Sequence, residues 1–139
     1  MVRILLVEDD EMSRELLSRR LKKLGYTVFA AVNGLDGFHA ARAEIPDVIL
    51  MDLCMPELDG ISAIRKLRAD DTTSAIPIIA LTALASPSDV QKAIDAGCNQ
   101  YETKPVHMDR LAGKINAVLT ADRRPAELEP GTSYDGEIS

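Results

Sequence analysis

The chain has 139 residues and carries 22 acidic against 16 basic side chains, a formal net charge of −6 at pH 7. This length fits one domain, and 46% hydrophobic residues are enough to build a core without disulfides or a structural metal. The acidic balance disfavours nonspecific binding to nucleic acid, which depends on neutralising phosphates with lysine and arginine. A disulfide-stapled mini-protein is excluded, and a dedicated DNA-binding protein is disfavoured.

Neither a membrane anchor nor a metal-binding cysteine motif is evident. The N-terminal apolar stretch runs only from Ile4 to Val7, too short for a signal-peptide core or a membrane span. We therefore expect a cytoplasmic protein. Cys54 and Cys98 lack metal-ligand spacing, and a reducing compartment would keep them as thiols, Cys98 being an ordinary buried one. His39 and His107 lack a partner at a recognisable spacing and are interpreted as surface residues.

Short apolar runs and helical patterns alternate along the chain. We predict, in chain order, a strand at 3–7, a helix with its apolar stripe between Met12 and Leu24, a strand at 27–31 and a helix at 34–44 that Gly37 interrupts. A strand at 48–51 precedes a helix capped by Asp59. The remaining predicted elements are a strand at 78–81, a helix from Ser86 to Gly97, a more polar edge strand at 100–103 and a helix between Met108 and Val118.

Five strand and helix repeats indicate an α/β fold. We predict a doubly wound, five-stranded parallel sheet in the order 2-1-3-4-5, with helices on both faces. Residues 1–120 form this one domain. Beyond them the periodicity stops, and the acid-rich segment 121–139 is expected to be a disordered polar tail.

Reactive or charged residues follow four of the five predicted strands. In open parallel sheets, ligands bind at the carboxyl ends of the strands, so these residues mark the candidate site. They are Glu8-Asp9-Asp10-Glu11 after the first strand, Asp52 after the third, Thr82 after the fourth and Lys104-Pro105 after the fifth.

The carboxylates after the first and third strands indicate a magnesium site. Neighbouring strands lie about 4.8 Å apart. Like charges at about 4 Å repel by roughly 1 to 4 kcal/mol, which a divalent cation relieves. We therefore predict that Asp9, Asp10 and Asp52 bind Mg²⁺. The alternative is that the first-strand acids cap the following helix, and for Glu11 we prefer that interpretation.

Asp52 is also a candidate nucleophile for phosphoryl transfer. Aspartate forms acyl phosphates in reactions that depend on positioning and charge neutralisation. Lys104 would supply the positive charge, with Pro105 fixing the turn that aims it, and the Thr82 hydroxyl would reach a phosphate oxygen. The alternatives are a solvated lysine and a hydroxyl bonded to local backbone.

These residues resemble the receiver domain of response regulators in two-component signalling, over about residues 1–120. The resemblance rests on Asp9-Asp10, on Asp52-Leu53-Cys54-Met55-Pro56-Glu57-Leu58-Asp59-Gly60, on Thr82-Ala83 and on Lys104-Pro105. It implies a flavodoxin-like (β/α)5 receiver similar to the single-domain chemotaxis regulators. Chemotaxis receivers are already among the known examples of order 2-1-3-4-5, so the predicted order is not independent of the resemblance.

The resemblance implies a phosphorylation switch rather than a turnover enzyme. Asp52 would accept a phosphoryl group from a sensor histidine kinase or a histidine phosphotransfer protein. Magnesium would be bound by Asp10, Asp52 and the backbone carbonyl of Cys54, with Asp9 acting directly or through water. Lys104 would pair with the phosphoryl oxygens.

The resemblance also implies how phosphorylation is read out. Thr82 would close onto the phosphoryl group, and Tyr101 and Pro105 would respond. A target protein would then recognise the face formed by the fourth helix, fifth strand and fifth helix. Because Cys54 and Leu84 have no side chain that orients an attacking water, we expect slow loss of the phosphoryl group.

Two further questions stay open from the sequence. The basic face of the first helix, which includes Arg14, is interpreted first as a solvated surface, and it can also serve as a partner-docking surface. Function is that of a stand-alone regulator or, alternatively, of an interaction module or a receiver cut from a hybrid kinase. A flavin site is disfavoured by the acidic first loop, and a P-loop is excluded because GxxxxGK[ST] is absent from the sequence.

Overall fold

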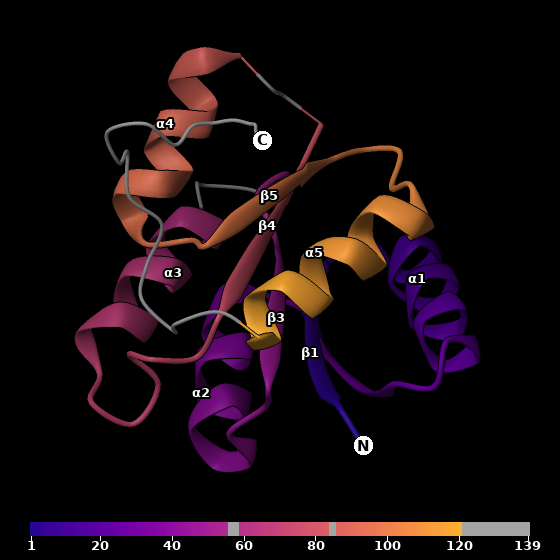
Figure 1. The fold of residues 1–139 in the computed structure, drawn as a ribbon. Helices are drawn as coiled ribbons and strands as arrows, with labels where there is room; N and C mark the ends of the chain where they lie inside the picture. The colour runs from indigo at the N-terminus through magenta and orange to yellow at the C-terminus, as the bar shows by residue number, and fades with distance from the viewer. Residues whose placement is uncertain (56–58, 84–85, 121–139) are drawn as a thin grey trace.

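A single parallel sheet with helices on both faces forms the molecule (Figure 1). The structure, a computed structural model, describes residues 1–55, 59–83 and 86–120. The strands are β1 (Arg3–Val7), β2 (Thr27–Ala31), β3 (Val48–Asp52), β4 (Ile78–Thr82) and β5 (Gln100–Thr103). The helices are α1 (Glu11–Lys23), α2 (Gly34–Glu44), α3 (Asp59–Ala69), α4 (Pro87–Ala96) and α5 (Met108–Thr120).

The predicted architecture is confirmed. The strand order is β2-β1-β3-β4-β5, all neighbours pair in parallel, and the polar β5 lies at an edge. β3 and β4 each extend one residue beyond the prediction, because Asp52 and Thr82 still belong to the strands. These polar side chains are therefore held by the sheet itself rather than by a loop.

Alternate residues of the strands face two separate cores. Leu5, Ile49 and Ile78 pack under α2, α3 and α4, whereas Ile4 and Leu50 pack under α1 and α5. In Figure 1, α1 and α5 lie on one side of the sheet and the other helices on the opposite side. The central strands are buried on both faces, which explains their uninterrupted apolar runs.

The apolar stripe predicted for α1 is only partly buried. Leu17 and Leu21 face the core, but Met12 is 82% exposed, Leu16 is 48% exposed and Leu24 is 51% exposed. The spacing had placed all five on one face. At about 100° per residue, Met12 and Leu16 lie roughly 100° or more around the helix from the buried pair, so they point to the surface. Leu24 is already the C-cap residue.

Gly37 lets α2 approach the sheet closely. A Cβ atom at this position would lie 2.7 Å from Cγ2 of Val7 in β1, well inside van der Waals contact. Its low helix propensity had indicated an interruption of the helix at Gly37, but α2 continues through this residue. The glycine allows the helix to pack directly against the strand that leads into the candidate site.

A buried carboxylate joins β5 to α5. Glu102 is 1% exposed and accepts hydrogen bonds from Arg110 (2.9 Å) and Lys114 (2.9 Å). Burial raises the pKa of Glu102, but the hydrogen bonds and charges of the two cations outweigh it and hold the pKa below its ordinary value. The edge strand is thus fixed to the helix behind it by a partnered buried charge.

Two predictions fall outside the described residues. The disordered tail expected at 121–139 lies outside the described residues, and so do Leu84 and the residues Pro56, Glu57 and Leu58 of the stretch that follows Asp52. Among the helices that the structure describes, none combines the length and apolar character needed to cross a membrane.

The Glu102 network predicts a loss of stability in acid. A carboxyl whose pKa is lower in the folded than in the unfolded chain stabilises the fold above its ordinary pKa, and this stabilisation disappears as pH falls through the folded-state pKa. At neutral pH, Glu102→Gln should lower the free energy of unfolding by about 1.5 to 3 kcal/mol. The gap between variant and parent should shrink below about pH 4.

Urea unfolding followed from neutral to acidic pH measures this gap. Glu44→Gln is the control, since Glu44 forms an exposed ion pair with Arg3 and should cost less than about 1 kcal/mol. A gap for Glu102→Gln that is equally large in acid and at neutral pH would contradict the assignment.

Candidate functional site

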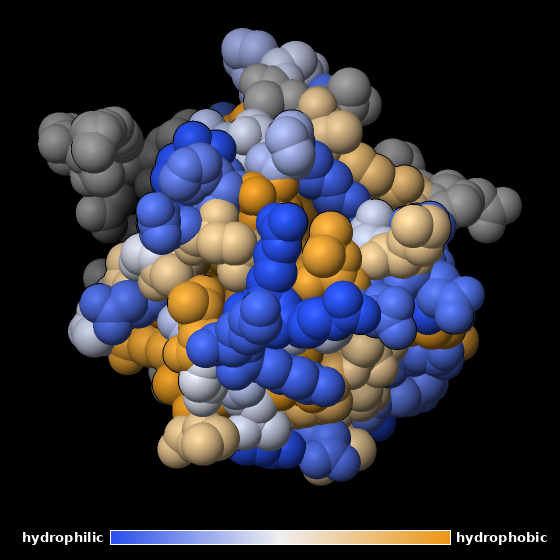
Figure 2. Space-filling model, turned by 90° about the vertical axis from the view of Figure 1, so that its right-hand side faces the viewer, coloured by the Kyte–Doolittle hydropathy of each residue, from blue (hydrophilic) through white to orange (hydrophobic). Residues whose placement is uncertain are grey.

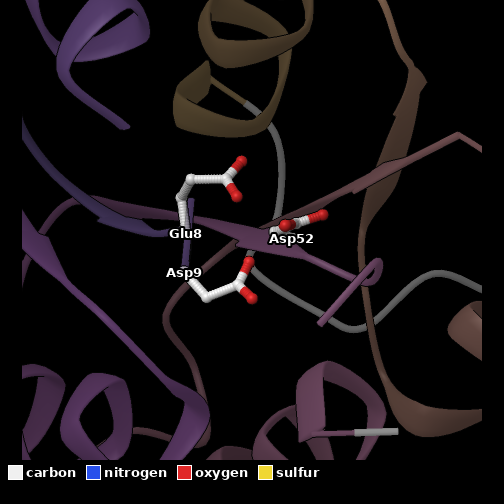
Figure 3. A group of neighbouring side chains, drawn as sticks. All are labelled: Glu8, Asp9 and Asp52. Carbon is white, nitrogen blue, oxygen red and sulfur yellow. The ribbon is translucent and has the colours of Figure 1, made fainter. Parts of the chain in front are cut away.

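Three carboxylates meet at the carboxyl edge of the sheet. Oxygen atoms of Glu8, Asp9 and Asp52 all lie within 4.8 Å of one another. Figure 3 shows the three side chains together at the ends of β1 and β3. Glu8 and Asp52 are buried, at 2% and 1% exposure, whereas Asp9 is exposed.

Parallel register brings two of these carboxylates together. The last paired residues of β1 and β3 are Val7 and Met51, so Glu8 and Asp52 are the next residues on adjacent strands. Both follow four buried apolar residues, which fix the strands in the core. Gly60 permits a close approach here, because a Cβ atom at this position would collide with the backbone carbonyl of Asp52. The first turn of α3 therefore lies directly against the end of β3.

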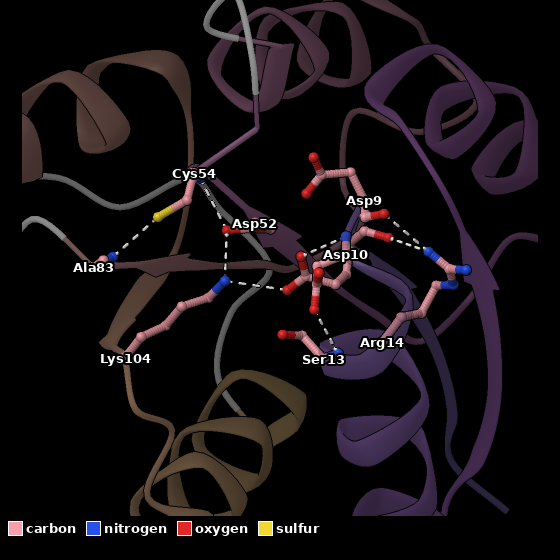
Figure 4. A network of polar contacts seen from close by, with 9 residues as sticks. Asp9, Asp10, Ser13, Arg14, Asp52, Cys54, Ala83 and Lys104 are labelled. Carbon is pink, nitrogen blue, oxygen red and sulfur yellow. Dashed lines mark hydrogen bonds and ion pairs between the residues drawn. The ribbon is translucent and has the colours of Figure 1, made fainter.

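Lys104 lies between the two buried carboxylates. Its Nζ atom is 3.1 Å from Oε1 of Glu8 and 3.1 Å from Oδ1 of Asp52 (Figure 4). The backbone N–H of Cys54 also donates to Oδ1 of Asp52, at 2.9 Å. Burial lowers the pKa of Lys104, but the hydrogen bonds and charges of Asp52 and Glu8 outweigh it and raise the pKa above its ordinary value. The lysine is thus held charged at the site.

The site carries more negative than positive charge. Burial, and then the hydrogen bond and charge of Asp52, raise the pKa of Glu8 to about 7. With all three carboxylates ionised, one ammonium group leaves two negative charges uncompensated among these four side chains. A divalent cation would neutralise this excess.

Asp10 does not join this group. It is the N-cap of α1, and its side chain accepts a hydrogen bond from the backbone N–H of Ser13 at 2.9 Å. That bond is the main reason why the pKa of Asp10 lies below its ordinary value. The structure therefore places Asp10 in the capping role that the sequence had left as the alternative, and brings Glu8 into the site in its place.

Sequence reasoning missed Glu8, although a signal for it was present. Glu8 directly follows the first apolar strand, just as Asp52 follows the third, and equal positions on adjacent parallel strands lie side by side. The sequence-based prediction assigned the metal site to the adjacent pair Asp9-Asp10, whereas the structure groups Glu8 and Asp9 with Asp52.

Thr82 and Tyr101 lie on β4 and β5, the two strands on the same side of β3 in the sheet. Thr82 is the last residue of β4 and is buried, with 6% exposure. Tyr101 is half-buried in β5, and the ammonium of Lys114 lies 5.3 Å from the centre of its ring. The peptide bond between Lys104 and Pro105 is cis.

The two cysteines differ in environment. Cys98 is buried, as predicted, and burial raises the pKa of its thiol to about 12. Cys54 is exposed just beyond β3, and its Sγ atom accepts a hydrogen bond from the backbone N–H of Ala83 at 3.2 Å (Figure 4). Both histidines are exposed, as expected for surface residues.

The donor set at the sheet edge fits magnesium. Mg²⁺ prefers oxygen ligands and is usually held by one or two carboxylates, with waters and phosphate oxygens completing the shell. Glu8, Asp9 and Asp52 provide carboxylate oxygens at mutual distances that one ion can bridge, and the exposed Asp9 leaves the site open to solvent.

Comparison with known proteins identifies the family. The family description "Response regulator receiver domain" matches residues 4–116 of this chain. The chain belongs to the response regulator receiver family. It is 44% identical over 119 residues to protein PilH of Pseudomonas aeruginosa, covering 86% of this chain and 98% of PilH. It is 34% identical to the polar-differentiation response regulator DivK of Brucella anthropi, covering 84% of this chain and 94% of DivK.

Solved receiver structures share the fold. The receiver domain of the sensor histidine kinase PA1611 from Pseudomonas aeruginosa, solved with a magnesium ion in its active-site cleft, superposes with a TM-score of 0.80 at 36% identity, covering 86% of this chain and 98% of that one. The chain spans about half the length of other curated relatives. For example, it is 37% identical over 126 residues to the transcriptional regulator RpaA of Synechocystis, covering 90% of this chain and 52% of RpaA.

Membership in the receiver family defines the general activity. Receiver domains are phosphorylation switches of two-component systems rather than turnover enzymes, and they interact with histidine kinases or phosphotransfer proteins and with downstream targets. Phosphorylation and dependence on Mg²⁺ are general in the family. The acidic cluster of Glu8, Asp9 and Asp52 fits that metal requirement.

Substitution by asparagine should affect Mg²⁺ binding at Asp9 but not at the neighbouring Asp10. Asp9→Asn should weaken Mg²⁺ binding by more than about tenfold, since even outer-shell changes at metal sites reach that size. Asp10→Asn should leave the dissociation constant nearly unchanged, because asparagine also caps helices and Asp10 lies outside the cluster. Calorimetric titration with Mg²⁺ measures both.

Each variant removes one negative charge, so long-range electrostatics are matched between them. A greater loss of affinity in Asp10→Asn than in Asp9→Asn would show that the ligand is Asp10.

Proposed function

We propose that this chain is a response regulator that accepts a phosphoryl group on Asp52 in a magnesium-dependent reaction and thereby switches its protein interactions. The observation that carries the proposal is the buried Asp52 carboxylate, 3.1 Å from the ammonium of Lys104 and grouped with Glu8 and Asp9. A carboxylate so placed is held rigidly. The neighbouring carboxylates would bind a cation, and the ammonium of Lys104 would bind a phosphoryl group.

Asp9, Asp52 and the backbone carbonyl of Cys54 would hold the magnesium ion, with Glu8 beside them. When bound, the ion supplies positive charge that offsets the negative charge of the entering phosphoryl group. This set replaces the sequence-based one at a single position, because Asp10 caps α1.

Asp52 is the nucleophile of the proposed step. A carboxylate oxygen of Asp52 forms a bond to phosphorus while the bond from phosphorus to the donor's histidine nitrogen breaks. The departing nitrogen keeps the electron pair, and neutral imidazole leaves when its other nitrogen carries a proton. Lys104 already contacts Asp52 and would pair with a phosphoryl oxygen, so the site is organised before the donor arrives.

Thr82, Tyr101 and Pro105 would carry the signal away from Asp52. Thr82 ends the strand adjacent to β3, and Lys104 donates its backbone N–H to the carbonyl of Thr82 at 2.8 Å, which couples β4 to the lysine turn. Tyr101 lies on β5, between this turn and α4. We propose that a downstream target binds the face of α4, β5 and α5, which these residues adjoin.

The phosphodonor would dock over α1. Met12 and Leu16 are exposed on this helix, and a cavity lined by Leu16, Arg20, Lys104 and Pro105 opens next to the site. Figure 2 looks onto this side of the molecule and shows hydrophobic surface exposed among charged side chains. An apolar patch beside the acceptor suits a kinase or a phosphotransfer protein that must bring a histidine close to Asp52.

A stand-alone regulator is the form we favour. The near-complete coverage of PilH and DivK supports a protein that acts through its receiver alone. The alternative, a receiver belonging to a longer protein, is supported by relatives such as RpaA, of which this chain matches about half. Location in the cytoplasm stays a prediction from the sequence.

The first experiment tests the acceptor. The parent protein incubated with acetyl phosphate and Mg²⁺ should gain one phosphoryl group, detected by intact-mass spectrometry. Asp52→Asn should abolish this gain, because the amide is not a nucleophile for phosphorus, and removal of Mg²⁺ with a chelator should also suppress it.

Asp71→Asn is the matched control, since Asp71 is an exposed turn residue and the same charge is removed. The proposed function would be overturned if Asp52→Asn gained as much phosphoryl group as the parent. It would also be overturned if the parent gained the same amount with and without Mg²⁺.

The second experiment tests phosphoryl lifetime. Cys54→Asn and Leu84→Glu should each shorten the half-life of the phosphorylated protein by about tenfold, because each adds a group that orients an attacking water. Cys54→Ala is the control, as it removes the thiol without adding such a group. If neither variant hydrolyses faster than the parent, the hypothesis that Cys54 and Leu84 slow the loss of the phosphoryl group is wrong.

A further inference from the structure

The segment that carries Glu8 and Asp9 is tied to α1 by one arginine. The Nη1 atom of Arg14 donates hydrogen bonds to the backbone carbonyl oxygens of Glu8, at 2.9 Å, and Asp9, at 3.3 Å. Figure 4 shows the guanidinium directed at the backbone rather than at the carboxylates. Arg14 is half-buried, whereas Arg19 on the same helix is exposed and pairs with Glu15 at 3.6 Å.

Other hydrogen bonds close the segment into a ring. The backbone N–H of Asp10 donates to Oε2 of Glu8 at 3.2 Å. The carboxylate of Asp10 accepts from the N–H of Ser13, and its carbonyl accepts from the N–H of Arg14 at 2.9 Å. The cap of α1 and the first part of the metal site therefore form one connected network.

Arg14 acts on Glu8 through a single peptide unit. In a trans peptide the C=O and N–H groups point in opposite directions. When Arg14 holds the carbonyl of Asp9, the N–H of Asp10 on the other side of that peptide is aimed at the Glu8 carboxylate, where the structure finds it. Turning this peptide over would remove both bonds together, would leave the Glu8 carboxylate held by Lys104 alone among these groups, and would shift the backbone that carries Asp9.

We propose that Arg14 is a positioning residue of the magnesium site, which holds Glu8 and Asp9 in their binding arrangement through the backbone. This inference rests on the proposed function, since it concerns the same site. Arg14 belongs to the basic face of α1, and the structure shows its Nη1 atom engaged by the backbone of the site. Outer-shell groups of this kind orient ligands and raise metal affinity.

The test is calorimetric titration of the full chain with Mg²⁺ in three variants. Arg14→Met keeps the alkyl stem but loses both hydrogen bonds, and should raise the dissociation constant by about 10- to 100-fold. Arg14→Lys should restore most of the affinity, because both bonds come from one nitrogen that an ammonium can replace. Arg19→Met removes the same charge from the same helix and should match the parent within about twofold, since exposed charges are screened.

Urea unfolding without Mg²⁺ separates positioning from stability. An Arg14→Met variant that is less stable but binds Mg²⁺ as tightly as Arg19→Met overturns the proposal, and so does an Arg14→Lys variant as weak as Arg14→Met. If Arg14→Met does not fold, Arg14→Gln, which is too short to span both carbonyls, takes its place with the same expectation. Failure of the parent to bind Mg²⁺ or to be labelled on Asp52 would instead overturn the proposed function.

Discussion

Two carboxylates are buried side by side at the end of β1 and β3, with the ammonium of Lys104 3.1 Å from an oxygen of each. An unpaired charge in such a place costs several kcal/mol, so the lysine stabilises the ionised form of both carboxylates. The lysine offsets one charge only. With the carboxylate of Asp9 included, negative charge exceeds positive charge at the site. A divalent cation would offset this excess, and the cation and Lys104 together would offset the charge of an added phosphoryl group. The chemistry proposed for Asp52 follows from this imbalance.

The rest of the fold keeps these charges in place. Apolar residues of β1, β3 and β4 are buried on both faces, and parallel register then determines which polar residues emerge side by side. Gly37 and Gly60 let helices lie against the strands that lead into the site. On the far strand, Glu102 fixes β5 to α5, next to the turn that carries Lys104. Together these contacts hold the side chains of the site in fixed positions at the carboxyl edge of the sheet.

Hydrophobic pattern was enough to predict a parallel sheet and the side chains that end β3, β4 and β5, because strand burial and parallel connection rules constrain them strongly. The strand order rested also on the resemblance to known receivers. It was not enough for α1. Spacing grouped Met12 and Leu16 into one apolar stripe with three other residues, yet both lie on a side of the helix that faces solvent. The choice between Asp9-Asp10 and Glu8-Asp9 also needed structure. Which carboxylate faces the site depends on where β1 ends and α1 is capped, and local sequence allows either boundary.

The central claim is that Glu8, Asp9 and Asp52, and not Asp10, form the metal site at which Asp52 is phosphorylated. Anomalous scattering from crystals of the full chain grown with Mn²⁺ in place of Mg²⁺ tests it most directly, since it locates the ion without reference to activity. The account predicts one strong peak between the carboxylates of Asp9 and Asp52, with Asp10 still bonded to the N–H of Ser13. A peak ligated by the Asp10 carboxylate, or crystals with Mn²⁺ bound elsewhere and none at this edge of the sheet, would contradict it.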